Sequence, residues 1–198
     1  MFYIFCEGKS REYEYFRYFR ELSSKIQLII IPPKNGETSP SKLYEAACKY
    51  LIKSENNQFT EYEVADIDDV WFVIDTDEWK DKIEKLRGNC TKNDWFVAQS
   101  NPCFEVWLFY HHFEYEPYLE NIRISKDWKK FVNTKISGGF DSRKHPIYVK
   151  RAIDNAKNHY SETNGKVEIA CTEVFKLAER FYPFIQHSIE KELQKNFL

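Results

Sequence analysis

Three acidic residues stand at the ends of apolar segments, where their side chains could act together. Glu7 directly follows the run FYIFC, and Asp75 and Asp77 close the run DVWFVIDTD. Alternate residues of an extended segment point the same way, so the DTD spacing aims both aspartates at one site. Neighbouring carboxylates repel one another and raise their own pKa values unless a cation joins them. A site of few carboxylates, with positions left for water and phosphate, suits Mg²⁺ or Mn²⁺.

These acids can meet only if their two segments become strands of one sheet. Residues 2–6 and 70–74 are continuous apolar runs, the pattern of strands that are covered on both faces. Strand and helix patterns alternate through about the first 115 residues, which predicts a parallel, doubly wound α/β sheet flanked by helices. Ligands of such Rossmann-like sheets bind beyond the carboxyl ends of the strands. We therefore expect all three acids at that edge.

Helical patterns replace this alternation from residue 116 onward. They cover residues 125–136, 145–160 and 172–193, and a polar, basic loop, SGGFDSRK, separates the first two. We therefore predict a core domain of residues 1–115 and a helical extension, residues 116–198, packed on it. Within the core, one helix is expected to close at Gly88. Another is expected to begin with Asn101 as N-cap and Pro102 as first residue.

Composition narrows the class of protein but does not fix a partner. Hydrophobic residues make up 42% of the 198 residues, which is enough for a sizeable core. Charge is nearly balanced, 29 basic against 31 acidic residues, so it neither requires nor excludes nucleic acid. No apolar run approaches the roughly 20 residues of a membrane span, and no signal peptide is evident. Five widely spaced cysteines without a CxxC pair indicate reduced thiols and a cytoplasmic protein.

Several motifs of the first 113 residues together resemble the RloB family. They are CEG at 6–8, Glu12, the pair YF at 15–16, IDTD at 74–77 and, above all, SNPCFEVWLFYH at 100–111. Two positions depart from the family pattern, because Arg11 stands in the place of a threonine and His112 in the place of a phenylalanine. The resemblance implies a TOPRIM-like domain, a role in defence against phage by abortive infection, and an ATPase partner.

The resemblance also implies a chemistry. TOPRIM domains use a glutamate after the first strand as acid, base or metal ligand, and a DxD pair as Mg²⁺ ligands. Glu7, Asp75 and Asp77 match these positions, and Glu12 would be a further ligand if two metals bind. A topoisomerase also needs a nucleophilic tyrosine from another domain, for which the chain has no room. Metal-assisted hydrolysis of DNA or RNA is therefore the favoured reaction, in which the metal generates a hydroxide near neutral pH.

Two rival functions remain open, and so does a homo-oligomer. The chain could be a non-catalytic regulatory subunit of an ATPase-containing defence complex. It could also be a hydrolase of small phosphate esters, because the same acids could hold one. Cleavage of nucleic acid, dependence on an ATPase, or cleavage of a small ester would distinguish these functions.

Other residues have both a structural and a functional interpretation. Asn101 would cap a helix or aim its N-terminus at a phosphate, and Glu105 would stabilise the helix dipole or contact the site. His111 and His112 are expected to be structural rather than metal ligands. Because acids repel a polyanion, cations must guide nucleic acid to the site. The residues predicted to do so are Arg143, Lys144, Lys150 and Arg151. The run DSRKH at 141–145, with Lys126, Lys129, Lys130 and Lys135 nearby, fits either a solvated surface or the phosphate-tracking patch that a nuclease needs.

Overall fold

Five strands form the central sheet of the computed structural model, which describes residues 1–8, 10–30, 39–53, 60–76, 79–115 and 122–196. Their order across the sheet is β2-β1-β3-β4-β7. The strands are β1 (Phe2–Cys6), β2 (Ile26–Ile30), β3 (Asp69–Asp75), β4 (Phe96–Asn101) and β7 (Cys171–Thr172). The first four run parallel, and β7 pairs antiparallel with the end of β4. The predicted α/β fold with a mostly parallel sheet is confirmed.

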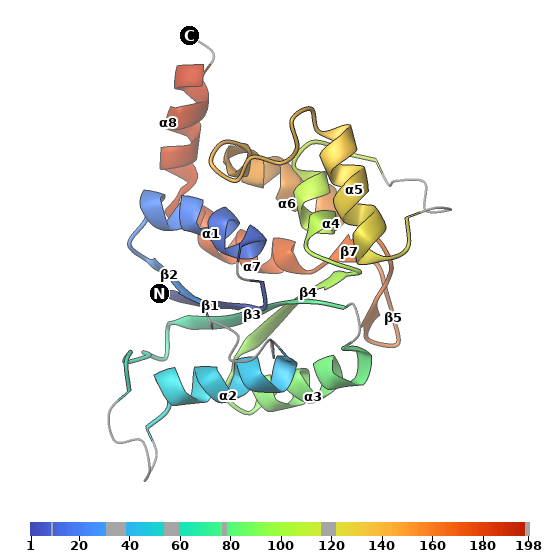
Figure 1. Ribbon diagram of the computed structural model, residues 1–198. Helices are drawn as coiled ribbons and strands as arrows, with labels where there is room; N and C mark the ends of the chain where they lie inside the picture. Colours follow the sequence, from blue (N-terminus) through green and yellow to red (C-terminus); the bar gives the residue numbers. More distant parts are fainter. Residues whose placement is uncertain (9, 31–38, 54–59, 77–78, 116–121, 197–198) are drawn as a thin grey trace.

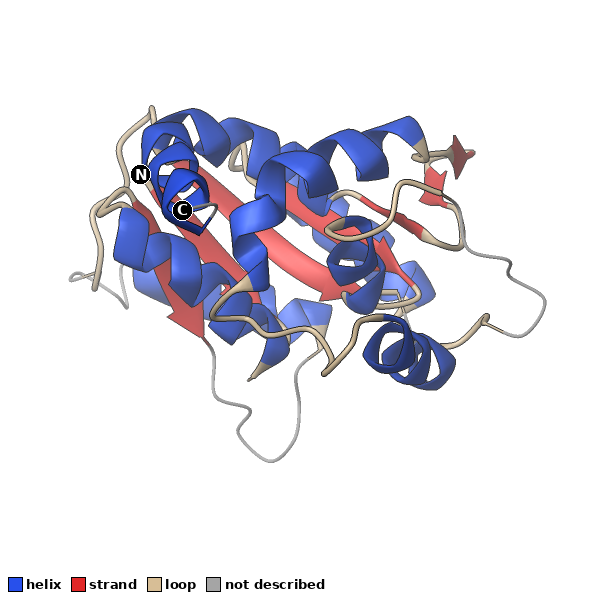
Figure 2. Cartoon of the chain, turned by 90° about the horizontal axis from the view of Figure 1, so that it is seen from above, coloured by secondary structure: helices blue, strands red, loops and turns tan. Residues whose placement is uncertain are grey.

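Helices cover both faces of this sheet, as the continuous apolar strands predicted (Figure 1). On one face lie α2 (Pro40–Leu51) and α3 (Lys80–Thr91). The other face carries α1 (Arg11–Leu22), α4 (Glu105–Tyr110), α6 (Val149–Asn158) and α7 (Val174–Phe181). Two further helices, α5 (Ser125–Lys135) and α8 (Gln186–Asn196), lie on the same side as this second group. Figure 2 shows the helices and the sheet from above.

Alternation along the strands divides the core into two hydrophobic clusters. Ile4 and Trp71 pack with α1, α4 and α7, whereas Tyr3 and Phe72 pack with α2 and α3. The larger cluster draws on both predicted domains, since it also contains Phe181 of α7. The boundary near residue 115 stays a prediction about folding units.

Two expected helix ends are wrong. The helix α3 continues through Gly88 to Thr91. The helix after β4 begins at Glu105, and its N-cap is Phe104 rather than Asn101. Asn101 is instead the last residue of β4, where it pairs with Cys171 of β7, and its side-chain amide donates to the Val167 carbonyl at 2.7 Å. The strand pairing of Asn101 with Cys171, 70 positions later in the chain, outweighs the local sequence pattern that favours a helix cap.

The region after residue 136 also differs from the all-helical expectation. Residues 145–160 begin with a 3₁₀ turn, His145–Tyr148, before α6, and Pro183 lies in a second such turn that separates α7 from α8. A hairpin of β5 (Glu162–Thr163) and β6 (Lys166–Val167) precedes β7. Its turn is Asn164-Gly165, with φ of 52° and 74°. Within the described part of the chain, no helix is long and apolar enough to cross a membrane.

Replacing Phe181 with Ala should test how tightly the C-terminal helices and the sheet are coupled. Phe181 is fully buried, and its ring lies 5.1 Å from that of Phe19 and 6.3 Å from that of Phe2. Loss of the ring should cost about 3–5 kcal/mol of unfolding free energy. We expect one cooperative urea transition, seen alike by tryptophan fluorescence and far-UV circular dichroism. Phe184→Ala is the control, because that ring is 47% exposed; two separate transitions would contradict the coupling.

Candidate active site

The carboxyl edge of the sheet contains its topological switch point, between β1 and β3. The chain leaves β1 through α1 to reach β2 on one side, and then crosses back through α2 on the opposite face to reach β3. Crevices at such points are the usual ligand sites of open α/β sheets. Glu7 follows β1 and Asp75 ends β3, and Cys6 is in register with Val73. The sequence rule therefore locates these two acids correctly.

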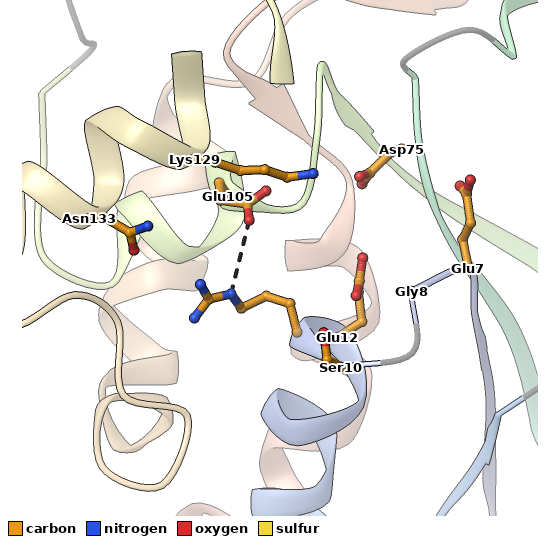
Figure 3. A pocket seen from close by; sticks show the side chains of 9 residues that line it. Glu7, Gly8, Ser10, Glu12, Asp75, Glu105, Lys129 and Asn133 are labelled. Atoms are coloured by element: carbon orange, nitrogen blue, oxygen red, sulfur yellow. Dashed lines mark ion pairs between the residues drawn. The ribbon is translucent and has the colours of Figure 1, made fainter. Parts of the chain in front are cut away.

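A cavity of about 490 Å³ opens at this point, and we call it the edge cavity (Figure 3). Four carboxylates and two cations line it. Together they come from the ends of β1 and β3 and from α1, α4 and α5. The lining residues are Glu7, Gly8, Ser10, Arg11, Glu12, Asp75, Glu105, Lys129 and Asn133. Glu7, Glu12, Asp75 and Glu105 of the predicted site are thus brought together. Asp77 lies outside the described residues.

The Glu7 carboxylate is held by an indole. Trp79, at the start of α3, donates its Nε1–H to Glu7 Oε1 at 2.7 Å. The Glu7 backbone N–H donates to the Val73 carbonyl at 3.3 Å, which extends the β1–β3 ladder by one residue. Sequence reasoning missed Trp79, whose only signal was its position two residues after Asp77. The indole fixes one carboxylate oxygen and so orients the group.

Glu12 lies in the first turn of α1, with its carboxylate packed against Gly8. A Cβ atom at position 8 would lie 1.9 Å from Glu12 Oε2, so any larger residue there would displace this carboxylate from its present position. Burial raises the pKa of Glu12 to about 7; its own backbone N–H opposes the rise, and the charges of Glu105 and Glu7 add to it. The CEG motif and Glu12 therefore form one structural unit, in which the glycine accommodates the carboxylate of the acid four residues later.

Arg11 and Glu105 join three elements across the cavity. The guanidinium Nε of Arg11 lies 4.0 Å from Glu105 Oε1, the ion pair drawn dashed in Figure 3. Arg11 Nη1 also donates to the Phe140 carbonyl at 3.2 Å, in the loop after α5. Glu105 is buried at the start of α4 and is therefore a site contact as well as a first-turn acid. Sequence reasoning noted Arg11 only as a departure from the family motif.

The other predicted residues lie elsewhere. Asn101 does not line the edge cavity. Three of the four predicted nucleic-acid cations have partners: Arg143 with Asp141 at 3.1 Å, Lys150 with Asp154 at 2.5 Å, and Arg151 with the His112 carbonyl at 2.8 Å. None of the four, Lys144 included, lines the cavity.

His111 has the structural environment that was expected. Its ring is fully buried, with Nε2 3.1 Å from the Tyr15 hydroxyl and Nδ1 3.0 Å from the Trp107 carbonyl. Burial lowers the pKa of His111 to about 3. The ring is therefore neutral at physiological pH and has both nitrogens occupied.

The donor set of the edge cavity suits a hard divalent cation. Its acidic groups are all carboxylates, and their mutual repulsion would be relieved by positive charge. Among the described residues, no three His, Cys, Asp or Glu side chains are already close enough to hold an ion. Asp77, the second aspartate of the DxD pair, is not part of that set. The residues present fit Mg²⁺ by chemistry, and Glu7 and Asp75 would be its first ligands.

Glu12→Gln should stabilise the metal-free protein at pH 8 and change it little at pH 4. Because the pKa of Glu12 is raised in the folded state, its protonation supports folding below about pH 4.5 and that contribution is lost as pH rises through about 7. Removing the charge should recover roughly 2–3 kcal/mol at pH 8. Urea unfolding in chelator measures the difference. Glu14→Gln, an exposed neighbour on α1, should show no such pH dependence; an equal effect of both changes would contradict the assignment.

Comparison with known proteins identifies one family. A family model described as RloB-like protein matches residues 2–181 of the 198-residue chain. No curated protein matches the chain, and neither does any solved structure.

Proposed function

The chain belongs to the RloB-like family, and from this membership and the edge cavity we propose that it is a Mg²⁺-dependent nuclease that hydrolyses phosphodiester bonds. The observation that carries the proposal is the meeting of Glu7, Glu12, Asp75 and Glu105 with two cations in one cavity at the switch point. Carboxylates suit the metal, and cations suit a phosphate. A site for a neutral ligand would need neither charge.

The proposed roles follow from the positions of the side chains. Glu7 and Asp75 would hold Mg²⁺, with Mn²⁺ an equivalent choice, and Asp77 would complete the DxD pair. When bound, the metal would polarise the phosphate and lower the pKa of a bound water. Trp79 keeps the Glu7 carboxylate in one orientation. Glu12 is the proposed ligand of a second metal ion.

The wider role is proposed from the family. As in the RloB proteins that the motifs resemble, the domain would be TOPRIM-like and would act in anti-phage defence by abortive infection, beside an ATPase. The five free cysteines support a cytoplasmic location. The chemistry proposed at the edge cavity draws on residues of this chain alone, and the nuclease assay tests whether cleavage also needs the ATPase.

Metal should stabilise the fold through Asp75. Millimolar Mg²⁺ that binds only the folded state raises the melting temperature by mass action. Asp75→Asn removes a ligand charge and should abolish most of that rise, whereas Asp66→Asn, an exposed aspartate outside the cavity, should leave it intact. Differential scanning fluorimetry with and without chelator gives the comparison. An unchanged wild-type melting temperature would argue against the site.

Nuclease activity is tested directly on plasmid DNA, total RNA and tRNA, each with Mg²⁺, Mn²⁺ or chelator. We expect cleavage only with metal, and a loss of at least about 100-fold in Glu7→Gln. Cleavage of p-nitrophenyl phosphate but of no nucleic acid would make the protein a small-ester hydrolase. Cleavage that appears only with an ATPase would make it one part of a two-component enzyme. No metal-dependent cleavage of any substrate, with or without an ATPase, would overturn the proposal in favour of a regulatory subunit.

A further inference from the structure

The two cations of the edge cavity have different surroundings. Arg11 is engaged by Glu105 and by the Phe140 carbonyl, which hold it against the cavity wall. Lys129 extends from α5 across the cavity toward the Asp75 carboxylate (Figure 3). It therefore brings positive charge to the place where a substrate phosphate would lie beside a metal ion held by Glu7 and Asp75.

The helix α5 is built to present this lysine. Trp128 and Val132 are buried at 0% and 1% exposure and anchor the helix to the larger hydrophobic cluster. Lys129 and Asn133, four residues apart and so on one face, both line the cavity. The Asn133 side chain packs against Gly139, where a Cβ atom would lie 3.3 Å from its Oδ1. Lys130, the next residue along, is exposed and outside the cavity lining.

The size of the edge cavity limits what can enter it. About 490 Å³ lies within the range of sites that enclose one small molecule. A volume of this size holds about one nucleotide-sized unit, which a single strand can present directly, whereas a duplex would first have to be unpaired and unstacked. The walls are the start of α1 on one side and α5 on the other.

We propose that α5 is the substrate-binding wall of the site: Lys129 binds a phosphate of a single nucleic-acid strand, and Asn133 hydrogen-bonds to the adjoining nucleotide. This inference rests on the proposed nuclease function and names its substrate class. In this proposal the main phosphate contact is Lys129, inside the cavity. The loop and helix around Arg143 and Lys150, which pair with Asp141 and Asp154, no longer provide it.

The position of Lys129 among carboxylates gives its removal two effects of opposite sign. Loss of a cation beside Asp75 should tighten Mg²⁺ binding, because less positive charge opposes the ion. The same loss should weaken binding of a strand and reduce its salt dependence by about 0.7 in slope, the value for one phosphate contact on a single strand. A purely structural lysine would weaken both or change neither.

The test uses fluorescence anisotropy of a labelled 12-nucleotide single strand, as RNA and as DNA, in Mg²⁺ over a series of salt concentrations. All variants carry Glu7→Gln, so that the strand is not cut. We expect Lys129→Ala to weaken binding about tenfold, and Lys129→Arg to restore most of it. Lys130→Ala, the matched control, should stay within about twofold of the parent. The corresponding duplex should bind the parent at least about tenfold more weakly than the strand.

Three results would overturn the inference. They are equal effects of Lys129→Ala and Lys130→Ala, a larger loss in the double variant Arg143→Ala/Lys144→Ala, and duplex binding as tight as that of the strand.

The Mg²⁺-induced rise in melting temperature is measured in Lys129→Ala with Glu7 intact, where it should be equal to or greater than that of the wild type; a smaller rise would show a structural role. If the wild type gains no stability from Mg²⁺ and cuts nothing, the proposed function fails, whereas the contrast between Lys129 and Lys130 still decides the binding wall.

Discussion

Repulsion among carboxylates at one end of the sheet is the constraint on which the site depends. Burial raises the pKa of Glu12 to about 7, and the charges of Glu105 and Glu7 add to the rise. Such an arrangement disfavours folding unless positive charge is present. The chain supplies part of that charge itself through Arg11 and Lys129, which leaves an excess of carboxylates in the cavity. That excess is the physical reason for proposing a divalent cation.

Rigid supports keep these groups together despite the repulsion. The buried strands β1 and β3 fix the backbone of Glu7 and Asp75, because helices cover both faces of the sheet. Trp79 fixes the Glu7 carboxylate, and the missing side chain at Gly8 gives Glu12 its place. Each support is local, so the site is held by the same packing that holds the fold.

Sequence patterns correctly predicted the features that depend on residues close together in the chain. Glu7 and Asp75 followed from apolar strands and the strand-end rule, and the Asn164-Gly165 turn was equally readable from the sequence, although it was overlooked. Asn101 was placed wrongly because its partner strand, β7, is two residues long and has no sequence pattern of its own. The approach of α5 to the sheet edge depends on tertiary packing of Trp128, which no spacing along the chain reveals.

Arg11 joins the start of α1 to α4 and to the loop after α5. Its neighbour Glu12 belongs to the acidic site, its guanidinium pairs with Glu105 of α4, and its Nη1 bonds to the Phe140 carbonyl. A threonine at this position is too short to span from α1 to the loop after α5, and it carries no charge to offset Glu105. The arginine therefore neutralises one acid of the cavity and, with the same side chain, ties the loop that follows Lys129 and Asn133 to the start of α1. One side chain therefore both offsets the charge of Glu105 and holds the loop after α5 at the start of α1.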